Sequence, residues 1–183
     1  MDLENPRPKD IDIHDIACGL SKICRFTGQL PQFYSVAQHA MLVAEVIEPR
    51  LRFPALNHDD SEAYLGDLTR NLKHSRYLAG YRTLERRWTA AINQALGIGR
   101  LVEADRRQLK AADDLAAVWE RTVLREGRPW EAWSCIETAV EQGWVRSNFL
   151  IMLALAEQIP SAVYLRGHYD AEQVFLDRFE QYQ

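Results

Sequence analysis

Apolar residues recur along this chain at the three- and four-residue spacing of amphipathic helices, without the alternating pattern of half-buried strands. A first such stretch covers residues 11–24, two longer ones cover 79–96 and 101–124, and a last one covers 170–182. Gly97 follows one long stretch and Gly127 the other, as is typical where helices end. The pattern predicts an all-α protein whose core is a helical bundle.

Two further helices are expected in the first half of the chain, and each carries a histidine. Ser35 is followed three residues later by Gln38, the capping-box pattern that opens a helix, and Pro49 limits its extent. A second helix is expected from 54 to about 64, because Gly66 ends the pattern. The same spacing predicts helices over 132–142 and 145–158.

Length and composition bound the class of protein. The 183 residues suit a single domain spanning 1–183, and no repeat, low-complexity segment or long linker divides them. Hydrophobic residues make up 47% and charged residues 26% of the chain, a balance typical of globular proteins. The net charge of −4 argues against a binder of nucleic-acid polymers, which usually carries a basic face.

The sequence also bears on the compartment. No apolar run reaches the roughly 18 residues that a membrane-spanning helix needs, and the polar N-terminus is unlike a signal peptide. The three cysteines contain no CxxC pair, so free thiols in a reducing compartment are expected and zinc held by cysteine is not. We therefore expect a cytoplasmic protein with no membrane partner.

Two histidines and two aspartates stand out as candidate metal ligands. His39, the pair His58-Asp59, and Asp113 come from three separate predicted helices. Imidazole nitrogen and carboxylate oxygen together suit Co²⁺, Mn²⁺, Zn²⁺, Fe²⁺ or Ni²⁺, and four protein ligands leave positions open for water and a phosphate oxygen. The sequence therefore predicts a divalent metal site.

Two acidic residues follow the His-Asp pair closely. Glu62 lies four residues after His58 and three after Asp59, so in a helix all three share one face, while Asp60 is expected to face away. Asp67 follows Gly66, where a loop can return it towards the same spot. Glu62 and Asp67 can thus lie beside the predicted metal site.

At these motifs the chain resembles the HD-domain phosphohydrolase superfamily, and within it the small bacterial 5′-deoxynucleotidases and the phage-type dATP triphosphohydrolases. The resemblance rests on the ordered segments 24–26, 33–39, 58–67 and 110–113, and it returns in the closing segment 171–179. It implies an HD-domain helical bundle. It also implies site residues by position, namely metal ligands at His39, His58, Asp59 and Asp113, catalytic acids at Glu62 and Asp67, a phosphate-binding Arg25 and a nucleoside-packing Phe26.

One of these assignments has an alternative, and two further points concern the nucleotide pocket. Asp105 also lies in a pattern similar to that around the fourth ligand, but only Asp113 has both Lys110 at the matching offset and Glu120 seven residues on, as relatives show. Relatives often show two prolines in the segment 68–73, but this segment contains none here, so the base preference stays open.

A basic stretch follows the acidic pair and is formed by Arg70, Lys73, Arg76 and Arg82. Lys73 is the best candidate in it to hold outer phosphates; the alternative is that the stretch is a solvated helix face.

The resemblance implies an enzyme that hydrolyses deoxynucleotides. The favoured reaction splits a deoxynucleoside triphosphate, with dATP first, into deoxynucleoside and triphosphate; the alternatives are a 5′-deoxynucleotidase acting on monophosphates and a non-catalytic nucleotide-binding module. A cyclic-nucleotide or signalling-nucleotide phosphodiesterase would need further paired histidines, which the sequence lacks. Related proteins form dimers or hexamers, so a homo-oligomer is expected, and Trp130, Trp133 and Trp144 are candidates for its interface.

Overall fold

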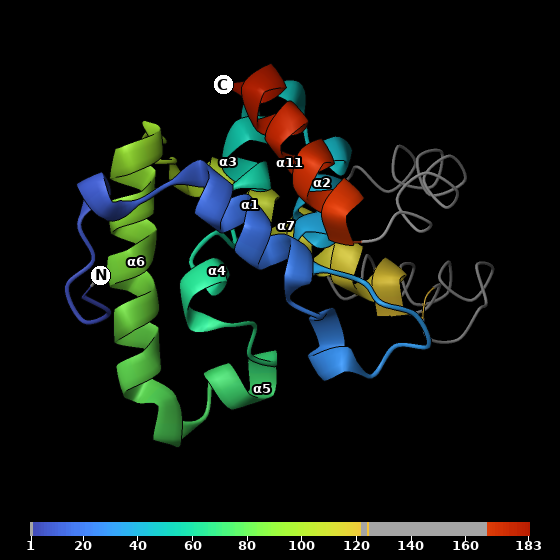
Figure 1. The fold of residues 1–183 in the computed structure, drawn as a ribbon, viewed down its shortest axis with the longest axis horizontal. Coiled ribbons are helices and arrows are strands. Elements are labelled where there is room, and N and C mark those ends of the chain that lie inside the picture. Colours follow the sequence, from blue (N-terminus) through green and yellow to red (C-terminus); the bar gives the residue numbers. More distant parts are fainter. Residues whose placement is uncertain (1, 122–123, 125–167) are drawn as a thin grey trace.

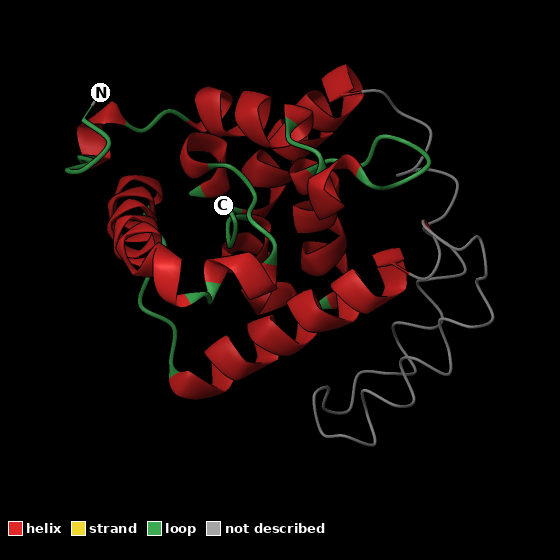
Figure 2. Ribbon diagram, turned by 90° about the horizontal axis from the view of Figure 1, so that it is seen from below, coloured by secondary structure: helices red, strands yellow, loops and turns green. Residues whose placement is uncertain are grey.

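The computed structural model of the protein describes residues 2–121, 124 and 168–183, and within these ranges every regular element is a helix. The all-α prediction is confirmed (Figure 2). One isolated antiparallel bridge joins Cys24 to Ser35. The helices expected over 132–142 and 145–158, and the three candidate interface tryptophans, lie outside the described residues.

Within residues 8–120 the helices follow one another with short connections. The four short 3-10 segments are η1 Pro8–Asp10, η2 Arg25–Gly28, η3 Pro49–Leu51 and η4 Arg76–Leu78. The α-helices are α1 Ile13–Lys22, α2 Val36–Val46, α3 Arg52–Leu56, α4 Glu62–Leu65, α5 Arg70–Lys73, α6 Ala79–Leu96, α7 Glu103–Glu120 and α11 His168–Tyr182.

Helix α2 forms the centre of the bundle, where it contacts α1, α3, α7 and α11 (Figure 1). Every residue of α2 except Glu45 is buried. Its start is the predicted capping box, since the Ser35 hydroxyl accepts from the Gln38 amide while the Gln38 side chain accepts from the Ser35 amide. A capped central helix gives His39, one turn in, a fixed position.

The C-terminal helix α11 closes the bundle against α1, α2 and α3, as the amphipathic pattern predicted. Ala171, Phe175 and Phe179 are its buried residues, and Phe179 packs against Phe53 with ring centroids 5.3 Å apart. Chain segments more than 100 residues apart therefore share one core (Figure 1).

Helix α6 stands at one side of the bundle (Figures 1 and 2). Its anchor is Trp88, which is completely buried, stacks on Tyr64 at a centroid distance of 4.1 Å and donates its indole hydrogen to the Leu3 carbonyl. The predicted range 79–96 matches α6, and Gly97 ends the helix in a left-handed conformation. Trp88 thus sets the distance between α6 and the segment that carries the candidate site.

The segment 54–64 is not the single helix that the sequence pattern predicted. The chain leaves α3 after Leu56, passes through turns at 57–61 and starts α4 at Glu62. The Asn57 side-chain amide donates to the Phe53 carbonyl, and His58 Nδ1 lies 2.7 Å from the Ala55 carbonyl oxygen. Such side-chain bonds compete with the helical pattern, so the His-Asp pair occupies a turn between two short helices.

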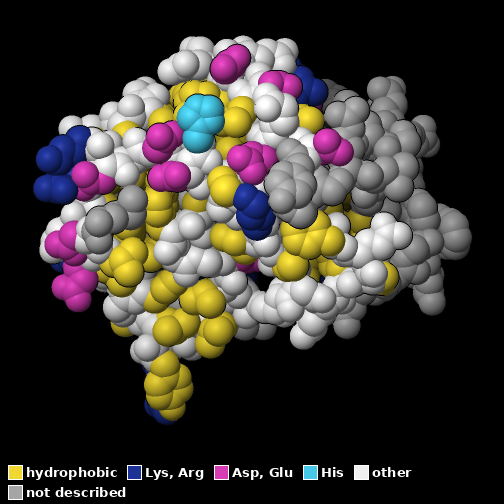
Figure 3. Space-filling view, viewed as in Figure 1, with side chains coloured by type: hydrophobic (Ala, Val, Ile, Leu, Met, Phe, Trp, Pro, Cys, Tyr) yellow, Lys and Arg dark blue, Asp and Glu magenta, His cyan; other side chains and the backbone are white. Residues whose placement is uncertain are grey.

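Acidic, basic and apolar side chains are interspersed on the face seen in Figure 3, and the described part of that face carries no extended basic surface. Of the helices that the structure describes, none combines the length and apolar character needed to cross a membrane.

Candidate metal centre

Four side chains from three segments meet between α2 and α7. Asp59 Oδ2 lies 3.2 Å from His58 Nε2 and 3.6 Å from His39 Nε2. Asp113 Oδ1 lies 3.2 Å from His39 Nε2 and 3.9 Å from His58 Nε2. One ring nitrogen of each of His39 and His58 and one carboxylate oxygen of Asp59 lie within 4.8 Å of one another, close enough to bind the same metal ion.

The two imidazoles are oriented as metal ligands would be. Nδ1 of His58 faces the Ala55 carbonyl, and Nδ1 of His39 faces the Glu120 carboxylate, so each Nε2 is directed to the cluster. His58 Nε2 is buried, and although Asp59 Oδ2 lies 3.2 Å from it, no described residue makes a well-formed hydrogen bond to this nitrogen. Buried polar atoms normally have partners, so this orphaned nitrogen fits a metal ion as its partner.

The charges of the cluster also favour a cation. Burial alone would lower the pKa of His58, but the carboxylates of Asp59 and Asp113 together with the Ala55 carbonyl outweigh burial and raise that pKa to about 9. Burial would raise the pKa of Asp59 and Asp113, yet His58 and His39 hold the pKa of both carboxyls below the usual range. The cluster therefore attracts positive charge, which a divalent ion would supply.

The structure separates the two candidates for the fourth ligand. Asp113 lies in the cluster beside His39, whereas the Asp105 carboxylate pairs with Arg50 at 2.7 Å. Lys110 donates to Asp113 at 2.7 Å, so the lysine at the matching offset is a direct neighbour of the carboxylate.

Glu120 anchors the cluster from behind, a role that the sequence analysis missed. Its side chain is completely buried, with Oε1 2.7 Å from His39 Nδ1 and 3.0 Å from the Tyr34 hydroxyl. Arg25 Nε donates to the other oxygen at 3.0 Å. Despite burial, Arg25 and His39 hold the pKa of Glu120 below its usual range. The spacing in the sequence could have indicated this role, because Glu120 lies seven residues after Asp113 and two helical positions seven apart lie on nearly the same face of a helix.

Glu62 lies at the start of α4 beside the cluster and is almost fully buried. Lys73 donates to its Oε1 at 3.1 Å, while Oε2 is buried without a partner among the described residues. Burial, followed by the charges of Asp59 and Asp67, raises the pKa of Glu62 to about 9. A carboxyl in this state readily holds a proton.

Asp67 follows α4 by way of Gly66. Gly66 has φ 79° and ψ 154°, a conformation that only glycine adopts easily, and its carbonyl accepts from the Tyr81 hydroxyl at 2.9 Å. Burial raises the pKa of Asp67, although the Arg25 guanidinium opposes this rise and the Asp59 charge adds to it. Asp67 is therefore within electrostatic reach of the cluster.

Asp60 is expected from the sequence to turn away from the spot where His58, Asp59 and Glu62 converge, with little consequence if its side chain faces outward, but the side chain is buried. It is only 1% exposed, neither carboxyl oxygen has a hydrogen-bond partner among the described residues, and burial raises its pKa well above the usual value. The expectation assumed a helix through 58–62, and the turn found there directs Asp60 inward instead.

Arg25, expected to bind phosphate, and Phe26, expected to pack on the nucleoside, lie next to each other beside the cluster. The Nε of Arg25 donates a hydrogen bond to Glu120, and its Nη1 lies 4.0 Å from the Asp59 carboxylate. The centre of the guanidinium lies 5.5 Å from the centroid of the Phe26 ring. Phe26 and Thr27 both have φ near 54°, in the left-handed region that side chains disfavour. Strain of this kind is often retained at functional sites.

The basic stretch is mostly engaged within the protein. Lys73 pairs with Glu62 and, at 2.7 Å, with Glu85. Arg70 pairs with Asp114, and Arg82 donates to the carbonyls of Lys73 and Ser75. Lys73 and Arg82 nevertheless line a cavity of about 510 Å³, together with His74, Ala79, Thr83, Glu85 and Arg86.

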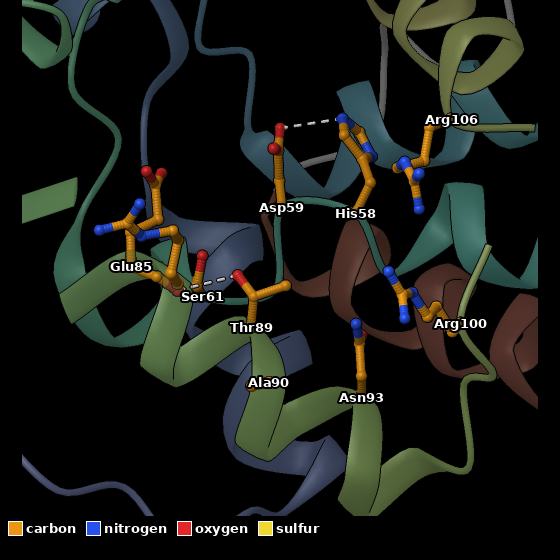
Figure 4. Close-up of a pocket in the computed structure, with 10 residues that line it drawn as sticks. His58, Asp59, Ser61, Glu85, Thr89, Ala90, Asn93, Arg100 and Arg106 are labelled. Carbon is orange, nitrogen blue, oxygen red and sulfur yellow. Dashed lines mark hydrogen bonds and ion pairs between the residues drawn. The ribbon is translucent and has the colours of Figure 1, made fainter. Parts of the chain in front are cut away.

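A larger cavity of about 720 Å³ begins at the cluster (Figure 4). His58, Asp59 and Ser61 form one part of its lining, and α6 and the start of α7 supply the rest. The candidate metal centre is therefore open to a ligand from the α6 side.

Comparison with family models finds none that matches the chain. The uncharacterized protein YfdR of Escherichia coli K12 is 41% identical over 115 residues, which cover 63% of this chain and 62% of YfdR. An uncharacterized protein of Rhodobacter capsulatus is 39% identical over 127 residues, or 64% of each chain. The matched part spans less than two thirds of either relative, and neither relative carries an assigned activity.

Proposed function

We propose that this chain is a metal-dependent phosphohydrolase of deoxynucleotides that belongs to the HD-domain superfamily. The favoured reaction converts a deoxynucleoside triphosphate, with dATP first, to deoxynucleoside and triphosphate. The observation that carries this proposal is a cluster of two imidazoles and two carboxylates from three segments. His39, His58 and Asp59 are close enough to share one ion, and Asp113 Oδ1 lies 3.2 Å from His39 Nε2. The buried carboxyl of Glu62 and the guanidinium of Arg25 lie beside this cluster.

His39, His58, Asp59 and Asp113 would hold the metal, which Co²⁺, Mn²⁺, Zn²⁺, Fe²⁺ and Ni²⁺ suit by ligand type. When bound, such an ion supplies a Lewis acid that polarises a phosphoryl oxygen and lowers the pKa of a water molecule.

Arg25 would orient the phosphate. Glu120 fixes its Nε, so the remaining donors of the planar guanidinium are directed at a set position and can bind two phosphate oxygens at once. Phe26, held beside Arg25, would pack on the sugar or base.

Glu62 and Asp67 would move the protons of the hydrolysis. A water oxygen forms the new bond to phosphorus, the bond from phosphorus to the 5′ oxygen breaks, and a proton passes from the water side to the 5′ oxygen. Glu62 can exchange that proton at its unpartnered Oε2, and the raised pKa of Asp67 suits a partner in the same exchange.

One observation favours a second candidate, a 5′-deoxynucleotidase acting on monophosphates. Lys73 and Arg70, which the triphosphate reading assigned to outer phosphates, are already paired with carboxylates of the protein. A site of this kind would need to hold only one phosphate at Arg25.

A product assay separates the candidates. The protein, loaded with Co²⁺ or Mn²⁺, is incubated with the four deoxynucleoside triphosphates and the four monophosphates, and the products are separated by ion-exchange chromatography. Free triphosphate with deoxynucleoside supports the favoured reaction and reports the base preference, whereas orthophosphate from monophosphates alone supports the second candidate. Metal bound without turnover of any of the eight substrates contradicts both and favours a binding module.

A further inference from the structure

Three arginines from three segments line the larger cavity. Arg86 comes from α6, Arg100 from the connection between α6 and α7, and Arg106 from the first turns of α7. Figure 4 shows Arg100 and Arg106 on the same side of the hollow as Asn93, with Glu85 and Thr89 towards its other end. Three guanidinium groups therefore share one concave surface, although the net charge of the chain is −4.

Two of these arginines are not neutralised by the protein. Among the residues that the structure describes, no carboxylate lies within ion-pair distance of Arg86 or Arg100, and Arg86 donates only to the Thr83 hydroxyl. Arg106 differs, because Glu103 accepts from it at 2.7 Å. The one acidic side chain of α6 in the cavity, Glu85, is paired with Lys73. The part of the cavity lined by Arg86 and Arg100 therefore carries positive charge that no described carboxylate pairs with.

The remaining lining suits an anion as well. Ser61, Thr89 and Asn93 supply hydroxyl and amide groups, and His58 and Asp59 of the candidate metal centre lie in the same cavity. A guanidinium binds phosphate oxygens through two parallel hydrogen bonds, and the two arginines of the cavity that pair with no described carboxylate attract anions there. A ligand with one phosphate at the metal centre can therefore extend further phosphates towards the arginines.

We propose that Arg86 and Arg100, assisted by Arg106, form a subsite for the outer phosphates of a polyphosphate ligand. The identity of that ligand as the substrate rests on the proposed function. This subsite places the outer phosphates against α6 and the start of α7, and it leaves Lys73 paired with Glu62 and Glu85. It also accounts for a cavity much larger than a single phosphate needs.

The test is the binding of inorganic tripolyphosphate to the full chain, measured by isothermal titration calorimetry. The metal content is determined before and after titration, so that loss of metal to the probe is accounted for. The double variant Arg86→Gln with Arg100→Gln is expected to bind tripolyphosphate at least about tenfold more weakly than the unaltered protein, because two charge-assisted contacts are lost. Arg107→Gln is the matched control, since Arg107 is exposed on α7, pairs only loosely with Glu103 and does not line the cavity.

Kinetics supply a second readout. The double variant should raise KM for a deoxynucleoside triphosphate by a similar factor with little change in kcat, and leave KM for a monophosphate unchanged. Equal tripolyphosphate binding by the double variant, the control and the unaltered protein overturns the subsite, as does an unaltered protein that does not bind the probe. Failure of the proposed function would give a different result. No deoxynucleotide would be hydrolysed, but the double variant would still bind tripolyphosphate more weakly than the Arg107→Gln control.

Discussion

Oε1 of Glu120 lies 2.7 Å from Nδ1 of His39, and both side chains are completely buried. This contact fixes the orientation of the imidazole and so directs Nε2 to Asp59 and Asp113. Glu120 also accepts hydrogen bonds from Arg25 and the Tyr34 hydroxyl. A single carboxylate therefore positions both His39, a candidate metal ligand, and Arg25, the candidate phosphate-binding residue.

Glu120→Gln should therefore weaken metal binding about 10- to 100-fold, as loss of a partner behind a histidine ligand typically does. Glu120→Ala removes the partner altogether and should cost about 3–5 kcal/mol of unfolding free energy, because it leaves buried positive charge without compensation. Metal titration and urea unfolding measure the two effects. Glu48→Gln at the surface is the control, and equal metal affinity in Glu120→Gln and Glu48→Gln would show that Glu120 does not position His39.

Asp113→Asn should reduce bound metal strongly, whereas Asp105→Asn should retain the metal content of the unaltered protein. Asp113 lies 3.2 Å from His39 Nε2, but Asp105 pairs with Arg50 away from the cluster. Elemental analysis of the two purified variants, with circular dichroism as a check of folding, measures the difference. Loss of metal from Asp105→Asn instead would reverse the assignment of the fourth ligand.

Glu62→Gln should slow turnover by about 10²–10⁴-fold while metal stays bound, because the amide can no longer exchange a proton at the unpartnered oxygen. Steady-state kinetics and metal content are measured together, since a loss of both would point to a structural role. Glu4→Gln near the N-terminus is the control. Full activity in Glu62→Gln would exclude Glu62 from proton transfer.

Gly66→Ala should destabilise the protein by about 1–3 kcal/mol through backbone strain, because the φ of Gly66 is 79°. No atom lies within 4 Å of the added methyl group, so a clash does not contribute. Gly80→Ala in α6 meets equally open space at an ordinary helical position and should stabilise by about 0.5–1 kcal/mol. Thermal unfolding compares the two, and a stabilised Gly66→Ala variant would contradict the strain argument. Activity of Gly66→Ala should also fall, because Asp67 follows directly.

The helices with strong local signals could be predicted from the sequence. The Ser35–Gln38 capping box and the glycine after α6 fix helix ends within a few residues, so α2 and α6 follow from short-range chemistry. The turn at 57–61 could not be predicted in the same way, because residues 57–62 are all polar and apolar spacing gives no signal there. Its cause is side-chain bonding by Asn57 and His58 to the chain just before them, which a periodicity argument does not weigh.

The candidate site divides along similar lines. The residues of the cluster could be named from motifs, because each motif is short and its order along the chain is specific. The anchoring role of Glu120, the burial of Asp60 and the arginines of the larger cavity depend on which segments meet in space. Those tertiary contacts depend on how the whole bundle packs, so no short segment of the sequence predicts them.

The contacts of Glu120 have a consequence for the order of events during synthesis of the chain. Its partners Arg25, Tyr34 and His39 precede it by 95, 86 and 81 residues, and Asp113 follows His39 by 74. Closing loops of this length costs chain entropy before any contact repays it. A nascent chain that has emerged only as far as α6 holds both histidines but lacks Asp113 and the Glu120 anchor, so the complete set of donor groups assembles only after α7 has been made and has docked on α2.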